Sequence, residues 1–324
     1  MANQLEEEPL MRVVVTGAAG FIGSTLSREL TEQGHSVMGI DSLTDYYDVR
    51  LKTANLAGIP KQRFTFCRAD LNELDLTSLL QDVDWVFHQA GQPGVRKSWG
   101  KDFGAYVANN IAASQRLLEA AKASRRLQRF VYASSSSVYG NVESYPTGEA
   151  HRPRPISPYG VSKLAAEHLC TLYASQFDVP TISLRYFTVY GPGQRPDMAF
   201  TRFVRAAIRR EKITIFGGGN QIRDFTFVDD IVQANVLAAE VGADPGEVFN
   251  VAGGSNVSVA DTLSMISELA GEELQVEHVE GVAGDVARTR GDTSRIAAGL
   301  GWRAAVGLEE GLKRQLAWGQ EVFK

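Results

Sequence analysis

The stretch TGAAGFIG, residues 16–23, follows the apolar run RVVVT and decides the fold of this 324-residue chain. Its three glycines stand between a predicted strand and a predicted helix: Gly17, Gly20 and Gly23. Glycine permits a tight turn, lets backbone N–H groups approach a pyrophosphate, and lets the helix pack closely on the strand. We expect Phe21 and Ile22, which lie between the glycines, to contact the same ligand. A purely structural turn is the alternative, and the surrounding sequence decides between the two.

Strand-like and helix-like segments alternate through the first half of the chain. The strand-like runs, rich in Val, Ile and Phe, are RVVVTG, HSVMGID, RFTFCRAD, DWVFHQAG, RFVYASS and TISLRYF. Helical periodicity marks three segments between them, FIGSTLSRELTEQG, LNELDLTSLLQD and FGAYVANNIAASQRLLEAAKAS. This alternation predicts an α/β fold built on a doubly wound parallel (Rossmann) sheet.

The alternation loosens after about Tyr190, where loop-rich segments precede one more strand (EVFNVAG) and a helix (VADTLSMISELAG). We therefore predict two domains. A Rossmann domain would cover residues 11–190 with parts of 225–252. A smaller C-terminal α/β domain, which binds the substrate, would cover residues 191–224 and 253–324.

Composition narrows the class of protein. The net charge of −5 and the absence of a dense basic stripe argue against a nucleic-acid partner. Cys67 and Cys170 lack metal-ligand spacing, so we expect no metal site and two reduced thiols. Residues 1–10 are acidic and do not resemble a signal peptide, and no apolar run approaches the roughly 20 residues that cross a bilayer. We expect a cytoplasmic protein that does not bind membranes.

An acidic residue ends the second predicted strand. Asp41 stands eighteen positions after Gly23, where its carboxylate would accept the adenosine ribose hydroxyls and repel a 2′-phosphate. This position favours NAD over NADP. Asp70 and Leu71 end the third strand, where the Asp70 carboxylate would meet the adenine amino group or cap a helix.

The fourth strand ends in HQAG, residues 88–91. Gln89 and Ala90 are expected to lie beside the dinucleotide, because small and polar residues at a strand end leave room for it. We interpret His88 as a structural histidine with satisfied hydrogen bonds.

Tyr159 and Lys163 stand four positions apart in PYGVSK, at the start of a predicted helix, so they share one face. A free tyrosine has a pKa near 10 and is a poor base at neutral pH. A neighbouring ammonium and a positive nicotinamide ring would lower the Tyr159 pKa by ~3, or about 4 kcal/mol. Lys163 would also hold the nicotinamide ribose. An isolated Tyr-x-x-x-Lys pair is often accidental, but here the glycine turn and Asp41 accompany it.

Four serines follow the fifth strand in SSSSVYG, residues 134–140. Together with TGAAGFIG and YGVSK, they resemble the extended short-chain dehydrogenases/reductases that act on nucleotide sugars, from about Arg12 to the C-terminus. This resemblance implies that Ser135 binds the sugar C4 oxygen and Tyr159 moves its proton, while hydride passes from C4 to NAD. Dehydratases of the family carry Asp-Glu in place of Ser136 and Ser137. The absence of this acidic pair here implies 4-epimerisation.

The segment FTVYGPGQRPDMAF resembles the UDP-glucuronate 4-epimerases, which implies conversion of UDP-glucuronate to UDP-galacturonate. Thr188 and Arg195 would face the sugar carboxylate, and Ser136 and Ser137 would donate further hydrogen bonds to it. The alternative is that Arg195 only ties down its Pro/Gly-rich loop. The family's Trp-Gly before this arginine is Gly193-Gln194 here. The resemblance implies four further substrate contacts: Arg96, Ser98, Arg223 and, more weakly, Arg290.

Three alternatives remain open at this point. The first is a UDP-glucose 4-epimerase, which would use the same catalytic residues. The second is a UDP-glucuronate decarboxylase. The third, a non-catalytic NAD-sensing protein, belongs to a different functional class. The resemblance also implies a homodimer. Its four-helix bundle would form from the helices around Ala105–Ala123 and Ser162–Ser175, with Leu117, Leu118, Leu164 and Leu169 on their faces.

Overall fold

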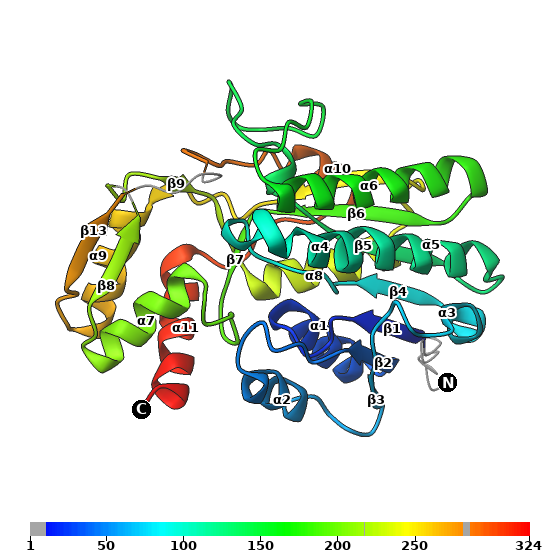
Figure 1. Cartoon of the computed structure of the whole chain (residues 1–324), viewed down its shortest axis with the longest axis horizontal. Coiled ribbons are helices and arrows are strands. Elements are labelled where there is room, and N and C mark those ends of the chain that lie inside the picture. The colour runs from blue at the N-terminus through cyan, green and yellow to red at the C-terminus, as the bar shows by residue number, and fades with distance from the viewer. Residues whose placement is uncertain (1–10, 217, 281–285) are drawn as a thin grey trace, which may run out of the picture.

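The computed structural model describes residues 11–216, 218–280 and 286–324. The segment 1–10, which the sequence predicts not to be a signal peptide, lies outside the described residues. The centre of the molecule is a seven-stranded sheet in which every neighbouring pair is parallel (Figure 1). Its spatial order is β11-β6-β5-β4-β1-β2-β3. The strands are β1 Arg12–Thr16, β2 Ser36–Asp41, β3 Phe64–Arg68, β4 Trp85–His88, β5 Arg129–Ser135, β6 Thr181–Tyr186 and β11 Glu247–Val251.

Helices cover both faces of this sheet, which confirms the predicted doubly wound fold. One face packs on α1 (Phe21–Glu32) and α8 (Val228–Glu240). The other face packs on α3 (Leu76–Leu79), α5 (Ala113–Ala123) and α6 (Pro158–Phe177). Side chains on β1 alternate between the two cores, with Val13 and Val15 on the α1 side and Val14 on the other.

Two of the expected helices differ in detail. The segment 71–82 is helical only over α3 and the 3₁₀ turn Leu80–Asp82, because the Asp75 side chain caps the helix at Ser78. The segment 103–124 is α4 (Phe103–Tyr106), a π-helical stretch Val107–Ala112, and α5. The sequence also gave no sign of α2 (Val49–Ala57), whose first turn is capped by Asp48.

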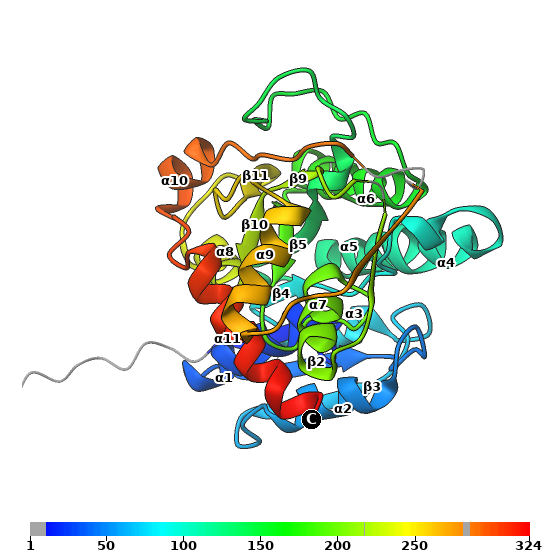
Figure 2. The same cartoon turned by 90° about the vertical axis from the view of Figure 1, so that its left-hand side faces the viewer.

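The C-terminal third forms a smaller body beside the carboxyl ends of the strands. Figures 1 and 2 show α7 (Ala199–Arg209), α9 (Val259–Ala270) and α11 (Leu308–Val322) packed together there. Helix α10 (Ser294–Leu300) packs near β11. Three two-stranded sheets complete this region: β7 Thr188–Tyr190 with β10 Phe225–Phe227, β8 Ile213–Phe216 with β13 Val276–Val279, and β9 Ile222–Arg223 with β12 Val257–Ser258.

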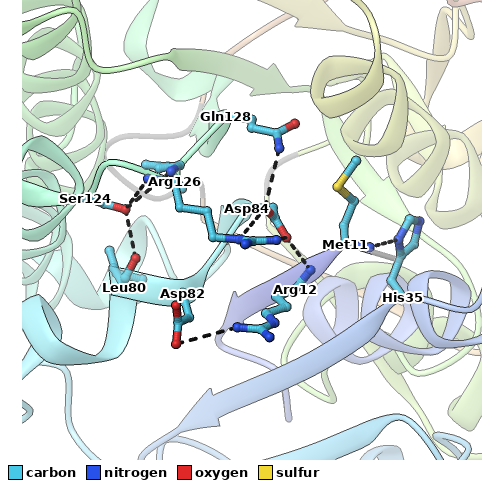
Figure 3. A network of polar contacts seen from close by, with 10 residues as sticks. Met11, Arg12, His35, Leu80, Asp82, Asp84, Ser124, Arg126 and Gln128 are labelled. Carbon is cyan, nitrogen blue, oxygen red and sulfur yellow. Dashed lines mark hydrogen bonds and ion pairs between the residues drawn. The ribbon is translucent and has the colours of Figure 1, made fainter. Parts of the chain in front are cut away.

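At the amino ends of the strands, the buried Asp84 carboxylate joins three segments (Figure 3). It accepts the Arg12 backbone N–H at 2.8 Å, pairs with the Arg126 Nε at 2.8 Å, and accepts the Gln128 side-chain amide at 3.4 Å. This network ties β1, β4 and β5 together at the end of the sheet opposite the pocket described below. Within the described ranges, no helix combines the length and apolarity needed to cross a membrane.

Candidate active site

A pocket with an empty volume of about 1230 Å³, partly open to solvent, lies at the carboxyl ends of the central strands. In open α/β sheets, ligands bind at this edge, where the strand order reverses. The structure brings together here all twelve residues that the sequence predicted to bind the cofactor: Gly17, Gly20, Phe21, Ile22, Gly23, Asp41, Asp70, Leu71, Gln89, Ala90, Tyr159 and Lys163.

The glycine turn at the pocket floor requires glycine for two physical reasons. Gly17 has a φ of +70°, and a Cβ there would lie 2.8 Å from the Ala90 nitrogen. A Cβ on Gly23 would lie 2.1 Å from the Gly17 carbonyl oxygen, so α1 approaches the turn as closely as backbone allows. Helix α1 begins after Gly20, with no side-chain cap and no acidic residue in its first turn. Its first N–H groups therefore offer a site for an anion such as a pyrophosphate.

Asp41 lies at the end of β2 and lines the pocket. Its carboxylate accepts the backbone N–H groups of Leu43 at 2.8 Å and Ala19 at 3.2 Å. The Lys52 ammonium from α2 lies 3.9 Å away, and burial lowers the Lys52 pKa while Asp41 opposes that shift. The carboxylate is thus fixed by the backbone at the place where a ribose would lie.

Asp70 lines the same pocket near the third strand. Its Oδ1 accepts the Asn72 backbone N–H at 2.9 Å, which makes a turn rather than a helix cap, because α3 begins only after Asp75. Of the two roles left open by the sequence, helix capping is therefore excluded.

His88 is buried and structural, as the sequence indicated. The Ser114 hydroxyl donates to the Asn110 carbonyl, so it accepts from His88 Nε2, and His88 Nδ1 then accepts from the Thr16 hydroxyl. The Thr16 oxygen accepts the Ala90 N–H in turn. Burial first, and then the Lys163 charge, lower the pKa of His88 to about 3, so it stays neutral.

Tyr159 shares a hydrogen bond with Ser135, so the end of β5 meets the first turn of α6. Burial raises the pKa of the Tyr159 phenol, while the Ser135 hydrogen bond and the Arg195 charge lower it. The sequence predicted that the Lys163 ammonium and a positive nicotinamide ring would lower this pKa. In the structure the net direction is upward, because burial outweighs the Ser135 hydrogen bond and the charge of Arg195.

Lys163 points from α6 toward the end of β5. Its Nζ donates to the Ala133 carbonyl at 2.8 Å and lies 5.1 Å from the centre of the Tyr132 ring. Burial lowers the pKa of Lys163 to about 8. The ammonium is therefore held on the pocket wall beside the cofactor positions and is more acidic than an ordinary lysine.

The four serines have different environments. Ser134 lines the pocket, and its hydroxyl donates at 2.6 Å to Glu167, whose carboxylate forms a buried bidentate pair with Arg185. The Ser135 hydroxyl accepts the Ser137 backbone N–H at 3.1 Å. Ser136 and Ser137 lie in the following 3₁₀ turn and are half-buried.

Arg195 lies in the loop between β7 and α7 and lines the pocket that also holds Tyr159. Its guanidinium binds the Asp197 carboxylate with two hydrogen bonds, at 3.0 and 2.9 Å, and lies 5.9 Å from the centre of the Tyr46 ring. Asp197 raises the pKa of Arg195 against the opposite effect of burial, which is the larger single cause.

The other predicted substrate residues lie outside the pocket lining. Arg96 is exposed, and its charge, after the larger effect of burial, lowers the pKa of Arg202 on α7. Ser98 is buried and donates to the Val95 carbonyl. Thr188 is half-buried on β7, while Arg223 on β9 and the exposed Arg290 belong to the smaller body.

Several residues in the pocket were missed by sequence reasoning. Tyr46 and Tyr47 lie in the segment DYYD, residues 45–48, for which no role was predicted, and Lys52 lies in the unforeseen helix α2. Ser134 was quoted within its motif without a role, and so was Asp197, which lies outside the lining but binds Arg195. The RPD sequence could have signalled the Arg195–Asp197 pair, because residues two apart in a loop can form such a fork.

The arrangement suits a dinucleotide with a hydroxyl-bearing substrate at its reactive end. The start of helix α1, the Asp41 carboxylate, the Tyr159 phenol and the Lys163 ammonium all line this one pocket. Among the described residues, no group of three or more His, Cys, Asp or Glu is placed to hold a metal ion. The Tyr159 and Ser135 hydroxyls would hold and deprotonate a substrate hydroxyl.

Comparison with known proteins identifies the family. Residues 13–252 match the model of the NAD dependent epimerase/dehydratase family. The chain is 42% identical to the uncharacterized UDP-glucose epimerase YtcB of Bacillus subtilis (strain 168), over 97% of this chain and 99% of that protein. It is 35% identical to the UDP-glucuronate 4-epimerase of Thermodesulfobacterium geofontis (strain OPF15), over 95% and 96%.

A solved structure shows the same likeness in three dimensions. The UDP-glucuronic acid 4-epimerase from Bacillus cereus, in complex with UDP-glucuronic acid and NAD, is 42% identical. It superposes with a TM-score of 0.93, over 96% of this chain and 100% of that one. With the glycine turn, the strand-end serine Ser134 and the Tyr-Lys pair in one pocket, this chain belongs to the NAD dependent epimerase/dehydratase family.

Proposed function

We propose that this protein is an NAD-dependent 4-epimerase that converts UDP-glucuronate to UDP-galacturonate through a transient C4 ketone. The observation that carries the proposal is that Tyr159 and Arg195 line one pocket while Ser135 hydrogen-bonds the Tyr159 phenol. The Tyr159 phenol shares a hydrogen bond with Ser135, and the Arg195 guanidinium acts on the same phenol from the pocket wall. The Tyr159 and Ser135 hydroxyls suit a sugar hydroxyl, and the Arg195 guanidinium suits a carboxylate.

The proton chemistry follows from these groups. NAD, when bound, supplies the hydride acceptor. Ser135 orients the sugar C4 oxygen, and Tyr159 takes its proton as the C4–H bond breaks. A cation next to the phenol favours phenolate, so Arg195 and a positive nicotinamide ring would both offset the effect of burial. When the ketone is reduced on the other face, Tyr159 returns the proton to the C4 oxygen.

The residues after Ser135 support epimerisation over further chemistry. Ser136 and Ser137 are neutral at physiological pH and cannot move protons at C5 or C6. An unassisted 4-keto sugar returns to the alcohol once its hydride is given back. Rotation of the ring before that step inverts C4.

A specific observation favours UDP-glucose as the second candidate substrate. The Bacillus subtilis relative carries the name of a UDP-glucose epimerase, and a neutral hydroxymethyl at C6 would use the same Tyr159 and Ser135. The Arg195 guanidinium favours the uronate, because a carboxylate accepts stronger, charge-assisted hydrogen bonds from this cation than the neutral hydroxyl of a hydroxymethyl group does.

The test of substrate is product analysis. NAD-loaded protein is incubated separately with UDP-glucuronate, UDP-glucose and UDP-xylose, and the products are identified by NMR. Formation of UDP-galacturonate at the highest kcat/KM supports the proposal. A preference for UDP-glucose would replace it with the second candidate, and release of carbon dioxide as the main reaction would indicate a decarboxylase.

The same proposal includes the domain division predicted from the sequence. The Rossmann domain covers residues 11–190 with parts of 225–252, and the nucleotide-sugar-binding domain covers 191–224 and 253–324. The positive charges of Arg96, in the 3₁₀ turn η2 (Arg96–Ser98), and of Arg202 on α7 repel each other, and a bound diphosphate would relieve this repulsion. We also propose a cytoplasmic location, supported by the free thiols of Cys67 and Cys170.

We propose that two copies form a dimer through α4, the π-helical stretch and α6. Exposed apolar side chains gather on these elements: Phe103, Val107, Val161, Leu172 and Phe177. Leu117 and Leu118, which the sequence suggested as contacts, are buried inside the subunit and cannot take part. Light scattering at micromolar concentration should give twice the mass of the chain, and a monomer mass would contradict this assembly.

A further inference from the structure

The Arg195 side chain is held by a carboxylate from its own loop. Asp197 accepts from Nε and from one N–H of Nη2, which occupies one edge of the guanidinium. The two N–H groups of Nη1 and the second of Nη2 have no hydrogen-bond partner among the described residues. The pair is asymmetric in exposure, since the side chains are 19% exposed for Arg195 and 39% for Asp197.

The backbone just before Arg195 is fixed independently of this pair. Gln194 is buried, and its side-chain amide donates to the Val189 carbonyl at 2.9 Å. Its Oε1 accepts the Thr201 backbone N–H at 3.0 Å and the Gln315 amide at 2.9 Å. The loop is thus pinned to β7, α7 and α11. What remains adjustable is the direction of the Arg195 side chain, and only Asp197 binds its guanidinium within the described part of the chain.

We propose that Asp197 is the positioning residue that aims the free edge of the Arg195 guanidinium at the C6 carboxylate of the sugar. This inference rests on the proposed function and names a residue outside the catalytic set. A bidentate carboxylate fixes the plane of the guanidinium, which a single hydrogen bond cannot do. Asp197 therefore determines both the preference for a uronate and the orientation of its carboxylate after C4 is oxidised.

Orientation matters because the oxidised uronate is a β-keto acid. When its carboxylate stands perpendicular to the C4 carbonyl plane, the C5–C6 bond breaks and carbon dioxide leaves. The electron pair of that bond forms an enolate on the C4 oxygen, and C5 then takes a proton from water. A guanidinium held in one plane keeps the carboxylate away from that orientation until the hydride returns. A loosely held guanidinium does not.

Two substitutions and one control test this role. Asp197→Ala removes both accepted hydrogen bonds, and Asp197→Asn keeps one acceptor oxygen while removing the charge. Asp244→Asn is the matched control, because Asp244 is an exposed aspartate in a loop before β11, outside the pocket. Binding of UDP-glucuronate and UDP-glucose is measured by calorimetry on NAD-loaded protein in a Tyr159→Phe background. Carbon dioxide release is measured with Tyr159 intact.

We expect Asp197→Ala to lower the binding affinity for UDP-glucuronate by about tenfold and that for UDP-glucose by less than about twofold, as the loss of a charge-assisted contact predicts. The affinity of Asp197→Asn for UDP-glucuronate should lie between those of Asp197→Ala and the unsubstituted protein. Both Asp197 variants should release a larger share of carbon dioxide than the Asp244→Asn control, with an unchanged melting temperature. Equal weakening of both sugars would overturn the inference. So would tighter binding of UDP-glucuronate, because it would show that Asp197 acts only by repelling the substrate.

The proposed function can fail separately. If the unsubstituted protein binds UDP-glucuronate and forms no UDP-galacturonate, the epimerase proposal is wrong, yet the binding ratio in the Asp197 variants still decides the positioning role.

Discussion

Replacing Lys163 by methionine should stabilise the cofactor-free protein at neutral pH while removing its activity. The Lys163 ammonium is only 6% exposed, and its one hydrogen bond within the described part of the chain is to the Ala133 carbonyl. Its pKa falls from 10.5 to about 8 because burial disfavours the charge. Methionine has a similar length and no charge, so it fills the same space without that cost.

The magnitude follows from the pKa. Between pH 8 and 10.5 the unfolded chain holds more protons at this position than the folded one, so the stability contributed by Lys163 rises with pH across that window. At pH 7 the buried charge costs about 3 kcal/mol, and at pH 10 it costs less than about 1 kcal/mol. Loss of the hydrogen bond to Ala133 offsets about 1 kcal/mol. Lys163→Met should thus gain about 2 kcal/mol at pH 7 and about nothing at pH 10.

The assay is urea unfolding of NAD-free protein at pH 7 and pH 10, with Lys61→Met as a control because Lys61 is exposed. NAD must be removed first, since a bound ligand adds its own stabilisation. A variant that is less stable than the parent at pH 7, or a gain that does not shrink at pH 10, would refute the reasoning. Either result would mean that Lys163 is not an ammonium forced into a poorly solvated site.

Three further predictions concern named contacts. Tyr159→Phe should keep the fold and lose at least ~10²-fold in kcat, with Ser135→Ala losing less, and near-normal turnover of Tyr159→Phe would remove it from the mechanism. NAD should bind more tightly than NADP, and Asp41→Ala should narrow that gap in calorimetry, whereas comparable dissociation constants in the parent would argue against Asp41 as the discriminator. Glu167→Gln should lower the free energy of unfolding by about 3–5 kcal/mol, since it leaves the buried Arg185 charge unpaired, and a loss under 1 kcal/mol would show that the site relaxes.

Local sequence rules were sufficient for most of the fold. The six runs rich in Val, Ile and Phe are six of the seven central strands, and EVFNVAG is the seventh. Parallel strands buried on both faces leave continuous apolar runs, and the glycines between β1 and α1 mark the turn. The short helix α2 escaped because its nine residues carry little amphipathic pattern and bury only Lys52. The π-helical stretch was not foreseeable, since it depends on the buried Asn110 binding Gln92 and Ser162.

The site divides in the same way. Residues fixed by strand ends and by the first turn of α6, such as Asp41 and Tyr159, could be placed from sequence because the topology fixes their position. The environment of Tyr159 could not, because it depends on Arg195 reaching the pocket from a loop 36 positions later in the chain, here held by Asp197. Side chains that depend on loop conformation are set by tertiary contacts that no local pattern records.

The central claim is that C4 is oxidised and reduced within one site, and isotope retention tests it most directly. UDP-glucuronate carrying deuterium at C4 is converted by the NAD-loaded protein in ordinary water, and unlabelled substrate is converted in deuterium oxide. Direct transfer of hydride to the cofactor and back predicts UDP-galacturonate that retains deuterium at C4 in the first case and gains none at C4 or C5 in the second. Loss of the C4 deuterium to water, or incorporation of solvent deuterium at carbon, would contradict the account.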